Sequence, residues 1–232
     1  MRCLITGASS GIGETIARRL AAEGHPVALM ARRTERVREI AAELGSAIAV
    51  PGDVGRGEDC EAVVQLVVEA FGGVDTLVNA AGTWVEEPLH AATYEQIRRF
   101  VDTDVSGALQ ITRAALPQLM KGGGRLVHIN GLQGLIRVRP PVLYATVESA
   151  VRGLCESLRW EAAPHGVHVG FITLGSVANT EAATPDMVVL HSGDERNRLS
   201  RDEVADAVLF MLSRPEGVNI DDLVLTPVQQ SF

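Results

Sequence analysis

Short β-branched runs alternate with longer amphipathic segments along the whole of this 232-residue chain. Cys60, Val63 and Val67, for example, recur at the spacing that places side chains on one face of a helix. Strands and helices that alternate in this way form parallel strands joined by right-handed crossovers. The sequence therefore predicts an α/β fold: a doubly wound, seven-stranded parallel sheet with helices on both faces.

The positions of the elements follow from the same pattern. Strands are expected at 3–5, 27–31, 47–50, 76–79, 125–129, 167–173 and 223–226. Helices are expected at 12–23, 34–44, 57–71, 93–120, 142–163 and 201–213. Helix N-caps are expected at Thr34, Thr93 and Ser200, and glycines that follow helix ends are Gly24, Gly45 and Gly72.

Composition narrows the class of protein. A chain with 46% hydrophobic residues is expected to form one compact domain over 1–232, and no apolar run reaches the roughly 18 residues that a membrane helix needs. The glycine cluster begins at Gly7, too early for a signal peptide, and the three cysteines suit reduced thiols, so a cytoplasmic location is expected. A net charge of −8 argues against binding to nucleic acid.

A glycine-rich turn joins the first expected strand to the first expected helix. Gly7, Gly11 and Gly13 lie in the segment Thr6–Gly13. Glycines allow a tight turn and let the backbone approach a pyrophosphate, whose charge meets the free N–H groups at a helix N-terminus. Ser9 and Ser10 add hydroxyl groups at this turn. The segment predicts a dinucleotide-binding loop.

Thr6–Gly13 resembles the TGxxxGIG signature of the short-chain dehydrogenase/reductase family, and the resemblance extends over nearly the whole chain. Leu77–Gly82 is similar to the family's LVNNAG segment, with Ala80 in place of the second Asn. Gly175 and Thr180 fit its PGxVxT segment, with Leu174 in place of the Pro. The ending, residues 218–227, is similar to a small NADP-dependent subgroup that acts on hydroxy acids and related alcohols.

The resemblance implies a Rossmann-like fold, a small-molecule substrate, and a homodimer or homotetramer built on the helices 93–120 and 142–163. It also implies a set of cofactor-binding positions: Gly7, Ser9, Ser10, Gly11, Ile12, Gly13, Asp53, Val54, Asn79, Ala81, Gly82, Gly175 and Val177.

Two arginines follow the second expected strand and indicate which nicotinamide cofactor binds. NAD enzymes usually place a carboxylate there to accept a hydrogen bond from the ribose 2′-hydroxyl. Here the chain has Arg32 and Arg33, whose guanidinium groups pair with a phosphate. The sequence therefore predicts NADP(H) in preference to NAD(H).

The catalytic positions depart from the family pattern. By the resemblance, the proton-transferring Tyr is Tyr144. The position of the family's Lys holds Glu148, that of its Ser holds Gly131, and that of its helix Asn holds Asp104. Asn130 or Gln133 is a candidate for the missing donor to a substrate oxygen.

The exchange of Lys for Glu148 reverses an electrostatic effect. A cation about 5 Å from the phenol is worth roughly 3 kcal/mol at an effective dielectric of ~20, about two pKa units downward. An ionised Glu148 changes the pKa of Tyr144 by a similar amount in the other direction. Tyr144 is therefore expected to stay protonated, which suits a proton donor in carbonyl reduction and makes it a poor base for alcohol oxidation.

Three functions remain open from the sequence. The first is a carbonyl reductase with a rebuilt site that uses Tyr144 as its acid. The second is a non-redox enzyme, such as a lyase, isomerase or cyclase, that uses Asp104, Tyr144 and Glu148 for acid–base chemistry. The third is a nucleotide-binding protein without chemistry.

Three other features of the sequence bear on the site. The irregular segment 175–199 is expected to be a substrate lid. His128 on the fifth expected strand and Trp84 after the fourth are candidates for the walls of the site. No Cys or His spacing predicts a metal site, His165 and His168 included.

Overall fold

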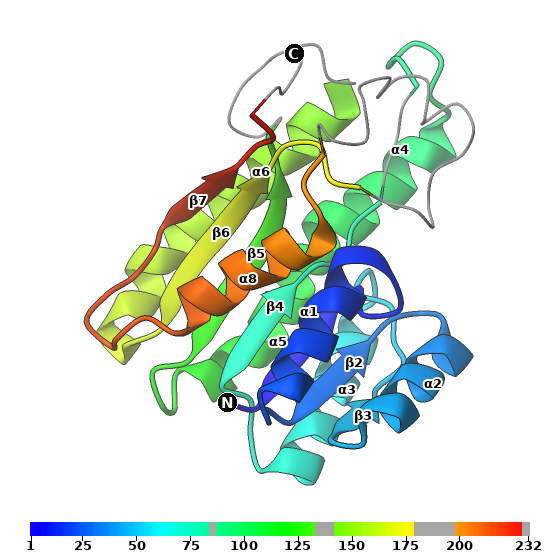
Figure 1. Ribbon diagram of the computed structural model, residues 1–232. Helices are drawn as coiled ribbons and strands as arrows, with labels where there is room; N and C mark the ends of the chain where they lie inside the picture. The colour runs from blue at the N-terminus through cyan, green and yellow to red at the C-terminus, as the bar shows by residue number, and fades with distance from the viewer. Residues whose placement is uncertain (84–86, 133–141, 179–197, 229–232) are drawn as a thin grey trace.

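The strands form a single all-parallel sheet, which confirms the predicted fold class (Figure 1). The computed structural model describes residues 1–83, 87–132, 142–178 and 198–228. The strand order is β3-β2-β1-β4-β5-β6-β7. The strands are β1 (Cys3–Thr6), β2 (Val27–Met30), β3 (Ala47–Ala49), β4 (Thr76–Asn79), β5 (Arg125–Gly131), β6 (His168–Leu174) and β7 (Asp222–Leu225). Gln133, Trp84, Thr180 and most of the expected lid lie outside the described residues.

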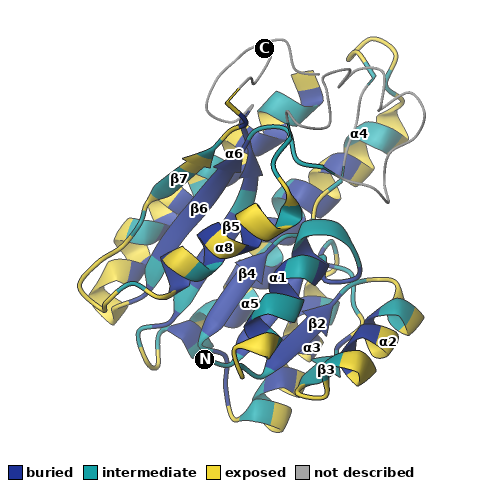
Figure 2. Cartoon of the chain, viewed as in Figure 1, coloured by how far each residue is buried: buried dark blue, intermediate teal, exposed yellow. Residues whose placement is uncertain are grey.

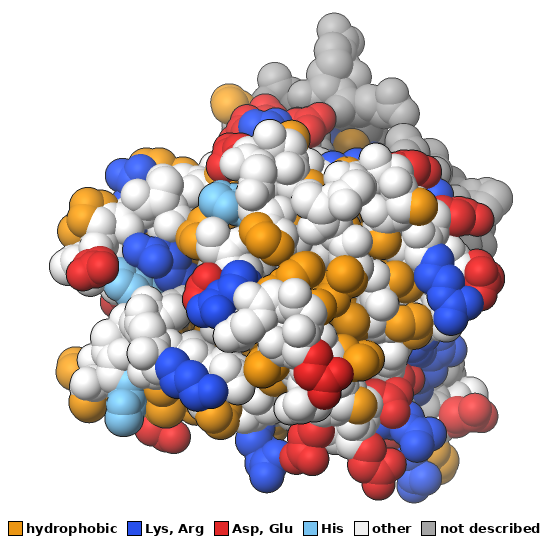
Figure 3. Space-filling model, turned by 90° about the horizontal axis from the view of Figure 1, so that it is seen from below, with side chains coloured by type: hydrophobic (Ala, Val, Ile, Leu, Met, Phe, Trp, Pro, Cys, Tyr) orange, Lys and Arg blue, Asp and Glu red, His pale blue; other side chains and the backbone are white. Residues whose placement is uncertain are grey.

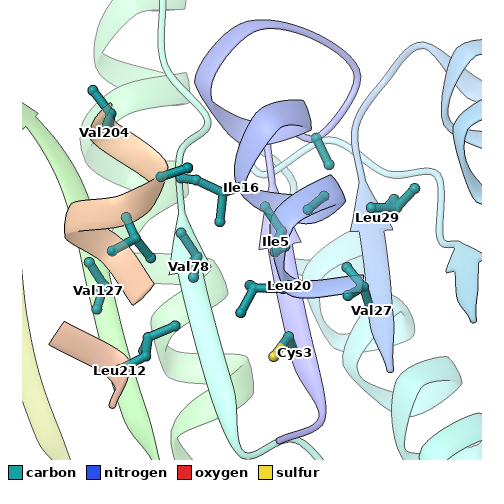
Figure 4. Close-up of a cluster of buried hydrophobic side chains, with 14 of the residues drawn as sticks. Cys3, Ile5, Ile16, Leu20, Val27, Leu29, Val78, Val127, Val204 and Leu212 are labelled. Carbon is teal, nitrogen blue, oxygen red and sulfur yellow. The ribbon is translucent and has the colours of Figure 1, made fainter. Parts of the chain in front are cut away.

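Helices cover both faces of the sheet because neighbouring residues of each strand point to opposite sides. On one face, Cys3 and Ile5 pack with α1 (Gly11–Ala22), α2 (Thr34–Leu44) and α8 (Arg201–Leu212) (Figure 4). On the other, Leu4 packs in a second cluster with α3 (Gly57–Phe71), α5 (Gly107–Leu119) and α6 (Val142–Ala162). Figure 2 shows the central strands buried and the outward faces of these helices exposed.

The expected helix 93–120 is interrupted. It consists of α4 (Tyr94–Phe100), a π-helical segment η1 (Val101–Ser106) and α5. The π segment contains Asp104 and is a local widening of the kind that often occurs at functional sites. The strict helical period of the sequence gives no sign of it. A short 3₁₀ turn, η3 (Ala163–His165), follows α6.

The expected helix caps are confirmed with one exception. Thr93 and Ser200 both form capping boxes, with Gln96 and Glu203 respectively. Thr34 was expected to be an N-cap, and this is wrong: Thr34 is the first residue of α2, and the cap position is held by Arg33 without a side-chain hydrogen bond. The backbone turns into the helix one residue earlier than the side-chain preference indicates.

Charges are mixed on the end of the molecule seen in Figure 3. Acidic and basic side chains are interspersed there around hydrophobic ones. None of the helices in the described part of the chain is long and apolar enough to cross a membrane.

Candidate active site

The carboxyl ends of the strands border a cleft of about 710 Å³. The strand order reverses between β1 and β4, and ligands of open α/β sheets bind outside such a reversal. Nearly all the site residues expected from the sequence line this one cleft: Gly7, Ser9, Ser10, Gly11, Ile12, Gly13, Arg32, Arg33, Asp53, Val54, Ala81, Gly82, Asp104, Asn130, Tyr144, Glu148, Gly175 and Val177.

The β1–α1 turn is packed too closely for side chains. A Cβ on Gly7, whose φ is +66°, would lie 2.5 Å from the carbonyl oxygen of Ala80. A Cβ on Gly13 would lie 2.5 Å from the carbonyl oxygen of Gly7. The glycines thus bring the start of α1 against the β4 loop, so that the backbone of its first turn lines the cleft. Such a turn fits the pyrophosphate of a nicotinamide dinucleotide.

The two arginines expected to select the cofactor are exposed beside this turn. Arg33 donates from Nε to the hydroxyl of Ser9 at 3.0 Å, which ties the β2–α2 connection to the glycine turn. Within the described part of the chain, neither Arg32 nor Arg33 forms an ion pair with a carboxylate. Their positive charge is therefore available to the cleft.

Asn79 does not line the cleft but supports its floor. The hydroxyl of Thr6 donates to Asn79 Oδ1 at 2.5 Å and accepts from the backbone N–H groups of Ala80 and Ala81 at 3.2 and 3.0 Å. Asn79 is 1% exposed. In this arrangement it positions the β4 loop and lies beneath the surface that a cofactor would touch.

The catalytic end of the cleft is built around Glu148. This residue and Tyr144 lie four positions apart on α6, on one face of the helix. Glu148 Oε2 accepts a hydrogen bond of 2.6 Å from the backbone N–H of Gly131, at the end of β5. The Tyr144 hydroxyl lies near the same carboxyl group, close enough for each to shift the pKa of the other. The Tyr144 ring stacks on Phe100 of α4, with ring centroids 6.1 Å apart.

Burial sets the proton affinity of this pair. Glu148 is 8% exposed, and burial raises its pKa to about 7 although the hydrogen bonds from Gly131 and Tyr144 lower it. Burial also raises the pKa of the Tyr144 hydroxyl well above its ordinary value, and the nearby Glu148 and Asp104 carboxylates raise it further. The expectation that Tyr144 keeps its proton agrees with these shifts in direction, with burial as the larger cause.

Asp104 is a second buried carboxyl in the cleft. Its two oxygens accept hydrogen bonds from the backbone N–H of Thr83 at 2.9 Å and from the Thr83 hydroxyl at 2.6 Å. Burial raises the pKa of Asp104 to about 6, against the lowering effect of the bonds from Thr83. Two carboxyl groups that both titrate near neutrality therefore face the same space.

The orientation of the Asn130 side chain differs from the one that a hydrogen-bond donor to a substrate oxygen requires. Its Nδ2 lies 3.5 Å from the backbone carbonyl oxygen of Glu148, and its Oδ1 has no hydrogen-bond partner. The amide nitrogen is thus directed toward α6. The other candidate for this role, Gln133, lies outside the described residues.

Sequence reasoning missed several residues that line the cleft, among them Thr83, Arg198 and Arg201. Arg201 is the first residue of α8 and donates from Nε to the carbonyl of Ala178 at 3.3 Å. Because a helix that follows a parallel strand begins at the carboxyl edge of the sheet, the N-cap at Ser200 was a usable signal for its neighbours. His128 lines the cleft as expected, with a pKa lowered to about 4 by burial.

Comparisons with known proteins agree with this architecture. The family model for short chain dehydrogenases matches residues 2–187, and the chain therefore belongs to that family. It is 31% identical over 227 residues to an uncharacterized oxidoreductase of Staphylococcus epidermidis, covering 97% of this chain and 96% of that protein.

Two solved structures extend the comparison. One is an alcohol dehydrogenase from Thermococcus sibiricus complexed with 5-hydroxy-NADP, with a TM-score of 0.88, 29% identity and coverage of 99% and 97% of the two chains. The other is a short chain dehydrogenase from Burkholderia cenocepacia in complex with NADP, with a TM-score of 0.87, 30% identity and coverage of 97% and 96%.

Proposed function

We propose that this protein is an NADP(H)-dependent carbonyl reductase in which Tyr144 is the proton donor. The observation that carries the proposal is the position of Tyr144 in the cleft, beside the Glu148 carboxyl and stacked on the ring of Phe100; burial and the nearby carboxylates raise the pKa of its hydroxyl well above the ordinary value. A donor with a raised pKa is suited to neutralising a developing alkoxide.

The chemistry divides between cofactor and protein. When bound, NADPH supplies a hydride to the carbonyl carbon of the substrate. Tyr144 transfers its proton to the carbonyl oxygen, so that the C=O bond becomes an alcohol. The start of α6 and the stacked Phe100 hold the hydroxyl in place for this transfer.

The same shifts give the reaction a preferred direction. Alcohol oxidation needs Tyr144 as a phenolate base, and both burial and the carboxylates disfavour that form. Reduction needs only the phenol. We therefore expect reduction to be much faster than oxidation at neutral pH.

The preference for NADP(H) over NAD(H) is part of the proposal. It is supported by the position of Arg32 and Arg33 at the cleft and by the NADP that the Burkholderia cenocepacia structure contains. A 2′-phosphate would meet two guanidinium groups at the turn held by the Arg33–Ser9 bond.

Steady-state consumption of NADPH with a panel of ketones and aldehydes tests the proposal. Tyr144→Phe is expected to lower kcat for reduction about a hundredfold or more while the Kd for NADPH changes little, because the phenol contributes the proton and the loops bind the cofactor. Retained turnover in Tyr144→Phe, or NADPH binding without turnover in the wild type, would contradict it.

A second candidate is a non-redox enzyme on the same fold. The observation in its favour is the pair of buried carboxyl groups, Asp104 and Glu148, with pKa values raised to about 6 and about 7. Such groups suit general acid–base chemistry. Substrate conversion that leaves NADPH unconsumed would favour this candidate.

We also propose a cytoplasmic homodimer or homotetramer. In support, large apolar side chains are exposed on the helical regions that the sequence associates with assembly: Val101 on η1, Leu109 on α5 and Trp160 on α6. The three cysteines are free and buried, as a reducing compartment permits. Sedimentation of the purified protein tests the assembly.

A further inference from the structure

The Glu148 carboxyl has neighbours on two sides. Gly131 donates its backbone N–H to Oε2 at 2.6 Å, and Tyr144, one turn earlier on α6, lines the cleft beside the same carboxyl group. The Glu148 carboxyl thus lies between the end of β5, to which it is bonded, and the phenol at the reacting end of the cleft. Gly131 has no side chain, so its amide is met directly by the carboxyl that reaches across from α6.

A purely structural role leaves the choice of residue unexplained. Glutamine would accept the same bond from Gly131 through its amide oxygen and carry no charge into a buried place. A carboxyl differs from an amide in that it can release and take up a proton near neutral pH. The position of Glu148 next to the proton donor makes that property useful.

Resting on the proposed reductase function, we propose that Glu148 is the proton source behind Tyr144. After Tyr144 has given its proton to the substrate oxygen, the carboxylic acid form of Glu148 returns a proton to the phenolate. The O–H bond of Glu148 breaks, the O–H bond of Tyr144 re-forms, and the resulting carboxylate recovers a proton from water in the cleft. No electrons move in this relay.

The surroundings of Glu148 favour its acid form near neutral pH. Burial raises its pKa to about 7, and Asp104, which faces it from η1, raises it further when ionised. His128 of β5 is held neutral by burial. Arg152, one turn along α6, is paired with Glu156 at 2.9 Å and with Asp222 at 3.1 Å. With Oε2 accepting from Gly131, the other carboxyl oxygen is the one that carries the proton.

Glu148→Gln tests the relay. The amide keeps an acceptor for Gly131 and a donor for Tyr144 but has no proton to release. We expect kcat for reduction at about pH 6 to fall tenfold or more, with KM and the Kd for NADPH within about threefold of wild type. The decline of wild-type kcat as pH rises through about 7 should be absent from the variant. Glu156→Gln, on the same helix and half exposed, is the matched control and should behave as wild type.

A second readout is independent of turnover. Infrared titration of the cofactor-free protein should show a protonated carboxyl band that disappears near pH 7 in the wild type and is missing from Glu148→Gln. If the wild type reduces carbonyl compounds and Glu148→Gln keeps both its kcat and its pH profile, the relay is wrong and the reductase function stands. If the wild type consumes no NADPH with any carbonyl compound, the reductase function fails and the relay with it.

Discussion

By the resemblance, two residues make the catalytic end more negative than the family pattern. Glu148 stands where the pattern has a Lys, and Asp104 where it has an Asn. A Lys would lower the pKa of the tyrosine, whereas burial and Glu148 raise that of Tyr144. In the proposed mechanism the phenol therefore serves as an acid and is poorly suited to act as a base.

The proposed cofactor preference also depends on single residues. Replacing both Arg32 and Arg33 by Ala should raise the Kd for NADPH by between tenfold and a hundredfold, because charge-assisted bonds to a phosphate are lost, and leave the Kd for NADH within about threefold. Arg38→Ala is the control, since Arg38 lies on α2 in an ion pair with Glu35. Equal losses for both cofactors, measured by fluorescence titration, would argue against a 2′-phosphate site.

The sequence predicted which candidate residues would meet in the cleft but not the bonds that they form. Tyr144 and Glu148 are four positions apart, so their shared helix face could be predicted. The bond from Gly131 to Glu148 joins residues 17 apart and depends on how the end of β5 meets α6. The direction of the Asn130 amide, which the sequence left open, depends on the same contact.

At the scale of elements, the close contact of the β1–α1 turn with the β4 loop shapes the cofactor end of the cleft. Gly7→Ala forces a Cβ against the Ala80 carbonyl in addition to the strain of a φ of +66°. We expect a loss of about 3 kcal/mol in the free energy of unfolding, with weakened NADPH binding. Gly24→Ala has a similar φ, +83°, in open space, and should cost only about 1 kcal/mol. Equal costs in urea denaturation would show that backbone strain alone matters.

The interrupted helix between Tyr94 and Leu119 shows where periodicity fails as a guide. Its start was predictable because Thr93 and Gln96 form a capping box from local sequence. The π segment was not, because it is associated with tertiary bonds, including those from Thr83 to Asp104. Local signals thus specify helix ends, whereas the widening that holds a site residue depends on contacts from distant parts of the chain.

At the scale of the whole molecule, a raised carboxyl pKa links the site to stability. The folded state holds the Glu148 proton up to about pH 7, while the unfolded chain releases it near the ordinary value of 4.5. Stability from this group is therefore present at low pH and lost as pH rises through about 7. His128, whose pKa is lowered to about 4 from an ordinary value of 6.5, has the opposite effect: its contribution makes the folded state less stable as pH falls below 6.5. Because His128 is the same in the wild type and in Glu148→Gln, a comparison of the two proteins removes this contribution.

We expect the wild type to lose about 1 kcal/mol more in the free energy of unfolding than Glu148→Gln between about pH 6 and pH 8.5. Urea denaturation at a series of pH values measures the difference. Parallel curves for the two proteins would mean that Glu148 is already ionised in the folded state at pH 6.

The overall architecture was the most predictable level. Alternating strands and helices with turn glycines define a doubly wound parallel sheet, and the strand bounds differ from expectation by at most two residues. Arg198 was missed because it lies in the irregular segment that follows β6, where the sequence has no periodic pattern to interpret. Arg201 begins the expected helix 201–213, so its place in the fold was predicted and only its place in the cleft was missed.

The central claim is hydride transfer to a carbonyl carbon at this cleft, with Tyr144 as acid. Incubation with NADPH deuterated at the transferring C4 position, followed by mass spectrometry of the product, tests it most directly. The account predicts one deuterium on the new alcohol carbon from the wild type and a product yield at least about a hundredfold lower from Tyr144→Phe. A product that forms without deuterium while the cofactor stays reduced would contradict it.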